Sequence, residues 1–322
     1  MSSKLVGYAL MLVLATLSAT AGAQAFPSKP VRMIVGFPPG GGTDIVARII
    51  APKLGENLGQ QIVVENRGGA NGILATELAA KAAPDGYTLF LGTLGNLAVN
   101  PTLYKTLPFD ISRDFAPVTQ VTDVWLVMIV HASFPAKSVN ELIALAKARP
   151  HPINYSTSGT GSALHLAGEL FGMVAGIKMT HIPYKGSAPS LTALLSGEVE
   201  LSVDTILLAQ QFMKAGRLRA IAVLGAKRSP LLQNVPTVAE SFPDYGVTNW
   251  FGLVAPAATP PDIRARIHAE AVKVLRSREI KERLLSQGAE PVGSTPEEFG
   301  AFLRSETAKW AKVIRNARID VD

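Results

Sequence analysis

The chain has 322 residues, of which 48% are hydrophobic and 17% charged, with no cysteine and a formal net charge of +6. The lack of cysteine excludes a disulfide framework and a thiolate metal site, and the interspersed basic and acidic residues argue against a nucleic-acid arm or a polybasic membrane patch. On a prior of about 150 residues per domain, the length predicts one large or two medium domains, and we expect two.

The first 25 residues are typical of a secretory signal peptide. Lys4 precedes an apolar run that reaches about Ala19, and small residues follow it. A positive start, a short apolar core and an A-x-A pattern together predict export, with cleavage after Ala23 or Ala25. An uncleaved membrane anchor is the less favoured interpretation, because the apolar run is too short to span a bilayer comfortably.

Downstream of the leader, the hydrophobic pattern alternates between strands and helices. Strands are predicted at residues 31–37, 61–66 and 87–93, and helices at residues 45–58 and 73–83. Pro52 is predicted to kink or interrupt the first helix, because proline lacks the N–H that the helix ladder needs. Residues 96–123 contain several prolines and are predicted to be irregular, so we expect the first lobe to end there.

The same alternation continues in a second group of elements. A capping box at Ser138 to Glu141 starts a helix that reaches Arg149. Strands are predicted at residues 125–130, 153–157, 179–184, 199–205 and 218–225, and further helices at residues 162–175, 188–195 and 207–214. Strands separated by helices of this length predict parallel sheets that are covered on both faces.

The tail combines one strand with several helices. The strand is predicted at residues 247–257, and the helices at residues 261–277, 280–287 and 296–317. Because the tail has too few strands to fold alone, we expect it to pack back onto an earlier lobe. If the tail returns to the first lobe, two strands cross between the lobes and form a hinge beneath the cleft.

Two glycine-rich turns share one design: a strand, a flexible turn and the start of a helix. PPGGGTD (residues 38–44) follows the first strand, and SGTGS (residues 158–162) follows a strand of the second group. Glycines let a ligand approach the backbone, and a helix start offers unpaired N–H groups and the positive end of the dipole. The pair therefore predicts an acidic small molecule held between two lobes.

Such turns are also ordinary connections in α/β proteins, so each alone is a weak signal. Neither turn contains G-x-x-x-x-G-K-[ST] or G-x-G-x-x-G, which disfavours nucleotide binding. A hydrolase would use Ser162 as nucleophile, His165 as base and Asp204 as orienting group. We disfavour this alternative because a serine at a helix start is a common cap and no G-x-S-x-G elbow is present.

Other polar residues are expected to have structural roles. Asp44, in the first turn of a helix, stabilises that helix with or without a ligand. Arg48, Arg67 and Lys185 are expected to be solvated or locally packed more often than to contact a ligand. The histidines have no metal-binding spacing, so no metal is predicted; they are His131, His151, His165, His181 and His268.

Longer motifs in this chain resemble a known family. They are FPPGGGTDIVAR, VVENRGGANG, AAPDGYTLFLGT, INYSTSGTGSALHLAGELF, HIPYKGSAP, VPTVAES and WFGLVAPA. In this order they are similar to the Bug (Bordetella uptake gene) family, the extracytoplasmic solute receptors of tripartite tricarboxylate transporters. The resemblance runs from about Phe26 to Ile319 and therefore covers essentially the whole mature chain.

The resemblance implies a periplasmic protein with the α/β type II periplasmic-binding-protein fold. Two lobes, joined by a hinge of two crossing strands, would close an interlobe cleft over a small organic acid, without catalysis or a cofactor. The implied ligand is a di- or tricarboxylate, an acidic amino acid or an aromatic carboxylate, and the implied partner is a membrane transporter. Lobe 1 would comprise residues 26–124 and 250–322, and lobe 2 residues 125–249.

The resemblance also maps binding residues onto both lobes. In lobe 1 they are Phe37, Pro39, Gly40, Gly41, Gly42, Thr43 and Asp44, with Thr93 and Asn96 after the third strand. In lobe 2 they are Ser158, Gly159, Thr160, Gly161, Ser162, His165 and Asp204. In such receptors backbone N–H groups, hydroxyls and ordered water hold the ligand carboxylate, and no arginine clamp is expected.

Overall fold

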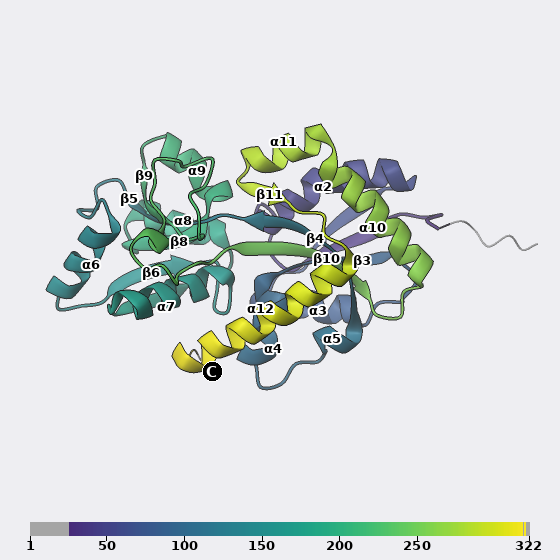
Figure 1. Ribbon diagram of the computed structural model, residues 1–322, viewed down its shortest axis with the longest axis horizontal. Helices are drawn as coiled ribbons and strands as arrows, with labels where there is room; N and C mark the ends of the chain where they lie inside the picture. Colours follow the sequence, from purple (N-terminus) through teal and green to yellow (C-terminus); the bar gives the residue numbers. More distant parts are fainter. Residues whose placement is uncertain (1–25, 318, 320–322) are drawn as a thin grey trace, which may run out of the picture.

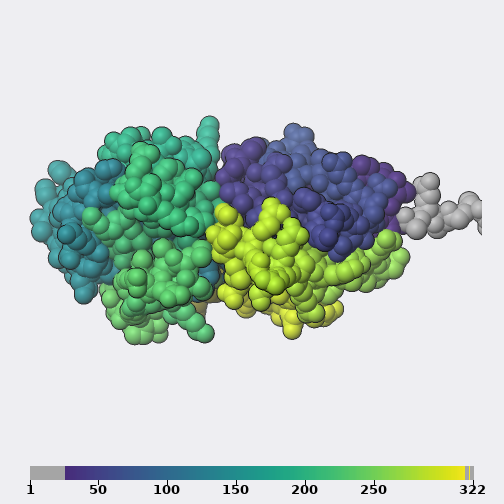
Figure 2. All heavy atoms as spheres, turned by 90° about the horizontal axis from the view of Figure 1, so that it is seen from above, coloured from purple at the N-terminus to yellow at the C-terminus, as the bar shows by residue number. Residues whose placement is uncertain are grey.

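The computed structural model describes residues 26–317 and 319, and the predicted leader lies outside these residues. The chain forms two lobes side by side, each built on its own β-sheet (Figure 1). Viewed from above, the two lobes press against each other along a narrow boundary (Figure 2). The predicted two-lobed α/β fold is therefore confirmed.

The sheet of lobe 1 has the strand order β11-β4-β10-β3-β1-β2. Its strands are β1 (Val31–Val35), β2 (Ile62–Asn66), β3 (Thr88–Thr93), β4 (Phe115–Val124), β10 (Asn249–Pro256) and β11 (Ala289–Pro291). β1 lies between β2 and β3 and is parallel to both. Its valine, methionine and isoleucine side chains are fully buried, as expected for a strand covered by helices on both faces.

The sheet of lobe 2 has the order β7-β6-β8-β5-β9 and repeats the plan of lobe 1. Its strands are β5 (Leu126–His131), β6 (Ile153–Thr157), β7 (Met179–Pro183), β8 (Leu201–Thr205) and β9 (Leu218–Val223). In lobe 1, β1 lies between β2 and β3, and β10 pairs antiparallel with β3. In lobe 2, β6 lies between β7 and β8, and β5 pairs antiparallel with β8. Both β10 and β5 enter their sheets from the other lobe. β1 and β6 occupy equivalent positions in the two sheets, and each leads into one of the two glycine-rich turns.

The sheets are mixed, whereas the sequence predicted parallel sheets. β10 is antiparallel to β3 and β4, and β5 is antiparallel to β8 and β9. β5 and β10 enter their sheets directly after crossing between the lobes. No crossover helix precedes them, so they are free to run in the opposite direction.

Helices cover both faces of each sheet. Those of lobe 1 are α2 (Gly42–Leu58), α3 (Ile73–Ala80), α10 (Pro261–Arg276), α11 (Arg278–Ser286) and α12 (Pro296–Ala317). Those of lobe 2 are α6 (Val139–Ala148), α7 (Ala163–Ala175), α8 (Ser187–Ser196) and α9 (Ile206–Lys214). Short helical segments are η1 (Ala70–Gly72), η2 (Gly95–Val99), α4 (Asn100–Leu103), α5 (Ile111–Asp114) and η3 (Val238–Glu240).

Two local predictions are corrected by the structure. α2 runs without a break through Pro52, which is exposed, while Ile49, Ile50 and Leu54 around it are buried. Their burial offsets the hydrogen bond that the proline cannot make. The stretch predicted to be irregular, residues 96–123, includes most of the ten-residue strand β4, whose Pro117 lies beside a register shift against β10, where a strand tolerates proline.

Two segments of chain cross between the lobes. β4 passes into β5 through Trp125, and the chain returns into β10, where Asn249 pairs with Val124. The backbone N–H of Trp125 donates to the carbonyl of Gly288 in lobe 1 (3.2 Å), and its carbonyl accepts from the N–H of Ile206 in lobe 2 (2.9 Å). Trp125 is therefore bonded to both lobes at the hinge.

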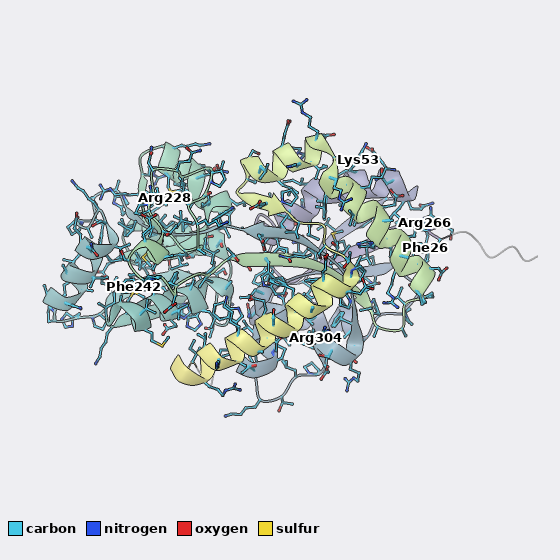
Figure 3. All side chains as sticks on the ribbon, viewed as in Figure 1. Phe26, Lys53, Arg228, Phe242, Arg266 and Arg304 are labelled. Atoms are coloured by element: carbon cyan, nitrogen blue, oxygen red, sulfur yellow. The ribbon has the colours of Figure 1, made fainter. Side chains whose placement is uncertain are left out.

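The C-terminal helix α12 packs diagonally across lobe 1 and reaches α7 of lobe 2 (Figure 1). Trp250 of β10 and Trp310 of α12 both donate their indole N–H to one oxygen of Glu306, each at 3.0 Å. At the other end of the lobe, Arg266 of α10 donates to the carbonyl of Phe26 (Figure 3). None of the described helices is long and apolar enough to span a membrane.

Candidate functional site

A cavity between the lobes encloses about 620 Å³ including its open mouth. The turns after β1 and β6 reach it from opposite sides. Lobe 1 contributes Phe37, Pro38, Pro39, Gly41, Gly42, Thr43, Thr93 and Phe251, and Asn249 lies at the crossing into β10. Lobe 2 contributes Ser158, Ser162, Ala163, Leu164, Lys185, Gly186, Ser187, Ala188, Pro189 and Thr205.

Three helices begin at this cavity. The first residues of α2, α7 and α8 are Gly42, Ala163 and Ser187, and all three line it. The N–H groups in the first turn of a helix have no intrahelical acceptor, and the helix dipole places partial positive charge there. No carboxylate side chain is among the lining residues, so the cavity is suited electrostatically to an anion.

The turn before α2 is held in shape by Asp44. One carboxylate oxygen accepts from the Gly40 N–H (2.9 Å), and the other accepts from Arg48 and Asn66 (2.9 Å each). Burial raises the pKa of Asp44, but the hydrogen bonds from Arg48, Gly40 and Asn66 outweigh it and lower the pKa below its ordinary value. Asn66 also donates to the Phe37 carbonyl (3.0 Å). Both carboxylate oxygens of Asp44 thus already accept hydrogen bonds from neighbouring residues.

Asparagines support the end of β3 in lobe 1. The side-chain oxygen of Asn96 accepts from both the N–H and the hydroxyl of Thr93, which lines the cavity. Asn96 and Asn100 in turn donate to the carbonyl of Asn71 (3.4 and 3.2 Å). Asn96 and Asn100 are buried, so their role is to fix the backbone beside the cavity.

The turn before α7 is held by Ser162 and His165. The Ser162 hydroxyl donates to the Gly159 carbonyl (2.7 Å) and accepts from the His165 N–H (3.2 Å), which caps the helix. The His165 ring nitrogen Nδ1 accepts from the Gly161 N–H (3.2 Å). Ala163 and Leu164 of the following turn line the cavity.

His165 stacks on His181 of β7, with ring centroids 3.9 Å apart. Burial lowers the pKa of His165 to about 4. Burial and the neighbouring His165 lower the pKa of His181 to about 3. Both rings are therefore neutral at physiological pH, which is consistent with Nδ1 of His165 accepting a hydrogen bond.

Asp204 lies at the end of β8, directly before the lining residue Thr205. It is fully buried, and its Oδ1 accepts from the Thr205 N–H (2.6 Å). Its Oδ2 accepts no hydrogen bond at ordinary distance among the described residues. Burial raises the pKa of Asp204 to about 7, although the nearby Ser187 side chain lowers it, so a neutral carboxyl is accessible near physiological pH.

The lobes touch around the cavity. A Cβ added to Gly161 would lie 2.5 Å from a methyl of Leu103 in lobe 1, and a Cβ on Gly186 would lie 3.7 Å from Pro38. A Cβ on Gly42 would lie 3.9 Å from the Thr205 hydroxyl of lobe 2. The structure therefore has the cleft closed.

Residues 46–319 match the model of the tripartite tricarboxylate transporter family receptor. The chain belongs to this family. It is similar to the protein BugT of Bordetella pertussis, with 38% identity over 95% of this chain and 94% of that protein.

Solved structures agree with this assignment. The adipate-bound Rpa4515 of R. palustris is 38% identical with a TM-score of 0.89, covering 92% of this chain and 99% of that one. MatC (Rpa3494) of Rhodopseudomonas palustris with bound malate is 32% identical with a TM-score of 0.84, covering 90% and 100%. The chain is therefore a periplasmic solute-binding receptor, and its family is not enzymatic.

Of the residues expected to bind, the structure gathers one set around the cavity of this receptor. Phe37, Pro39, Gly41, Gly42, Thr43, Thr93, Ser158 and Ser162 line it. Gly159 and Thr160 line a larger adjoining cavity instead. A third set lies behind the lining and supports it: Gly40, Asp44, Asn96, Gly161, His165 and Asp204.

Sequence reasoning missed the third helix start. The turn after β7 contains Gly186 before α8 and so repeats the design of the two glycine-rich turns, a signal that was present in the sequence. Asn249 and Phe251 come from the returning strand β10 and had no local signal. Four further lining residues lie next to residues that were predicted to bind the ligand: Pro38, Ala163, Leu164 and Thr205.

The arrangement does not form a hydrolytic triad. The Ser162 hydroxyl is bonded to backbone groups, and the His165 ring accepts from a backbone N–H. Asp204 is bonded to Thr205. Among residues 26–317 and 319, no group of three or more histidine, aspartate and glutamate side chains is placed to hold a metal ion.

Proposed function

We propose that this receptor captures a small carboxylate-bearing organic acid between its lobes and delivers it to a tripartite tricarboxylate-type membrane transporter. One observation carries the proposal: the N-termini of α2, α7 and α8 converge from both lobes on a cavity that has no acidic side chain in its lining. Adipate and malate, named with the similar structures, are both dicarboxylates and support this ligand class.

The energetics require donors from both lobes. Hydrogen bonds to a charged group contribute about 1.5–3 kcal/mol each, so four or five contribute on the order of 10 kcal/mol. Association costs about 4–15 kcal/mol, and micromolar affinity requires about 8 kcal/mol net. Donors on one lobe alone are insufficient. Closure over the ligand and apolar contact with Phe37 and Phe251 supply the remainder.

The binding residues follow from the same reasoning. We propose that the lining residues contact the ligand and that Asp44, Asn96, His165 and Asp204 act by holding the turns. We propose lobe boundaries at residues 26–124 with 250–322 and at residues 125–249, supported by the crossings at Trp125 and Asn249. Removal of the leader after Ala23 or Ala25 belongs to the same proposal, and N-terminal sequencing of the exported protein tests it.

Thermal-shift screening of the mature protein against organic acids tests the ligand class. We expect stabilisation by carboxylates and none by neutral sugars, because the cavity offers donors and positive dipoles. At a ligand concentration of 100 times Kd the expected stabilisation is about 2.7 kcal/mol. Binding only to uncharged sugars or to cations contradicts the proposal.

A matched pair of serine variants tests the site. Ser162 and Ser138 both cap a helix by accepting an N–H at 3.2 Å, but only Ser162 lines the cavity. Each change to alanine costs about 1 kcal/mol of stability. Because the Ser162 hydroxyl holds the turn that lines the cavity, we expect Ser162→Ala to weaken carboxylate binding about tenfold and Ser138→Ala to leave it unchanged. Equal affinities of the two variants argue against this cavity as the site.

A further inference from the structure

Lys185 occupies an unusual position between two cavities. It is the one ionisable side chain among the residues that line the inner cavity. It also lines an adjoining outer cavity of about 1230 Å³, together with Phe37, Pro38, Ser158 and Gly186. These shared residues form the junction between the two spaces. A ligand that extends from the inner cavity into the outer one must therefore pass Lys185.

The ammonium group of Lys185 is not neutralised by the protein. Lys185 is exposed, and it makes no ion pair within residues 26–317 and 319. Its neighbour Tyr184 donates to Glu198 (2.7 Å), so that carboxylate is engaged elsewhere. The positive charge of Lys185 is thus available to a group on the ligand.

The turn that carries Lys185 is fixed in place. The Gly186 N–H donates to the carbonyl of Ser158 (3.1 Å), and the Tyr184 N–H donates to the carbonyl of Thr157 (3.2 Å). These bonds join the turn to the binding turn of the same lobe. The backbone of Lys185 therefore keeps its place relative to the N-termini of α7 and α8, and the flexible side chain carries its positive charge from that fixed point.

We propose that Lys185 is a specificity-determining residue that pairs with a second carboxylate of the ligand, while the first carboxylate is held by the helix N-termini. This inference rests on the proposed function, since it assigns the far end of the same ligand. The three helix N-termini converge on the inner cavity, so a carboxylate that extends beyond the junction meets Lys185 instead, and the lysine accounts for selection of dicarboxylates over monocarboxylates of equal length. The outer cavity accommodates ligands of different length beyond the junction.

Calorimetric titration of the mature protein tests the inference. The probes are the best dicarboxylate of the organic-acid screen and the monocarboxylate with the same number of carbons, for example adipate with hexanoate. We expect the native receptor to prefer the dicarboxylate by at least about tenfold, and Lys185→Met to reduce that preference to about twofold or less. Lys185→Arg retains the charge and should keep most of the preference.

Lys214→Met is the matched control. Lys214 is an exposed lysine of the same lobe that lines neither cavity, so its removal lowers the net charge equally. We expect it to preserve the preference. A preference that persists in Lys185→Met, or that is absent from the native receptor, overturns the inference and leaves the proposed function intact. Failure of every carboxylate to bind overturns both.

Discussion

Gly161 shows how one missing side chain permits the lobes to meet. Its φ is +77°, and it faces Leu103 and Asn71 across the boundary between the lobes. Asn71 itself adopts a positive φ of 47°, which is uncommon for a residue other than glycine. Backbone strain of this kind concentrates at functional sites, and here it lies at the closure contact.

Gly161→Ala should therefore impair closure. The new methyl would lie 2.5 Å from Leu103, so we expect carboxylate affinity to fall by about tenfold or more. Gly197→Ala is the control, because Gly197 has the same φ of +77° and nothing within 4 Å of the added Cβ. Both variants incur similar backbone strain of about 1–2 kcal/mol. Calorimetric titration that finds equal affinities for the two variants contradicts the closure role.

Asp204 yields a second prediction that concerns a single residue. Burial raises its pKa to about 7 in the folded protein, against an ordinary value of 3.8. A raised folded pKa contributes stability that is present at low pH and lost as the pH rises through about 7. Asp204→Asn removes this titration but keeps the Oδ1 acceptor.

We expect the free energy of unfolding of Asp204→Asn, relative to the native protein, to rise by about 2–3 kcal/mol between pH 5 and pH 8. Urea denaturation at both pH values measures it. A difference that does not change with pH would mean that Asp204 titrates near its ordinary value.

Individual elements differ in how far the sequence predicts them. α7 is bounded by Ser162 as N-cap and Gly176 as a left-handed C-cap, so both ends are encoded locally. β4 was missed because the prolines of residues 96–123 argue against a strand, whereas Pro117, the proline inside β4, lies beside a register shift that only the pairing with β10 creates. Pairing between distant segments overrides local propensity in this strand.

The stacking of His165 of α7 on His181 of β7 yields a prediction about the pH dependence of stability. His165 and His181 have pKa values lowered to about 4 and 3, so their neutral forms stabilise the fold above an unfolded value of about 6.5. This stability is lost as the pH falls toward 4. In the Asp204→Asn background, we expect the free energy of unfolding to drop by about 2–5 kcal/mol between pH 7 and pH 4.5.

Proton NMR of the imidazole resonances provides a direct measurement. Two histidines should remain neutral down to about pH 4.5, and the His165→Gln variant should remove one of these signals. Titration of both rings near their ordinary pKa would refute the buried neutral stack.

On the scale of the whole molecule, the binding site was predictable where the backbone does the binding. The glycine-rich turns around Gly41 and Gly159 can be recognised in the sequence, because close approach of a ligand to the backbone requires residues without side chains. Asn249 and Phe251 enter the site only because β10 returns from lobe 2 to lobe 1. Their place depends on the sheet order, which no local pattern specifies.

The hinge offers a readout of closure. Trp125 bonds to Gly288 in lobe 1 and to Ile206 in lobe 2, and its ring packs against Gly225. Trp250 and Trp310, in contrast, are fully buried, and both indoles donate to Glu306 of α12. Because its backbone is bonded to both lobes, Trp125 should change its surroundings more than the other two indoles when one lobe rotates against the other.

We therefore expect a saturating carboxylate to change the tryptophan fluorescence of the native receptor, and Trp125→Phe to lose most of that change. Because the ring of Trp125 lies outside the cavity lining, calorimetry should show affinity within about threefold of native. Full retention of the fluorescence change by Trp125→Phe would place the ligand-induced movement away from the two crossing strands. A receptor of that kind would have to close by bending within a lobe, which its continuous sheets resist because a packed core does not deform gradually.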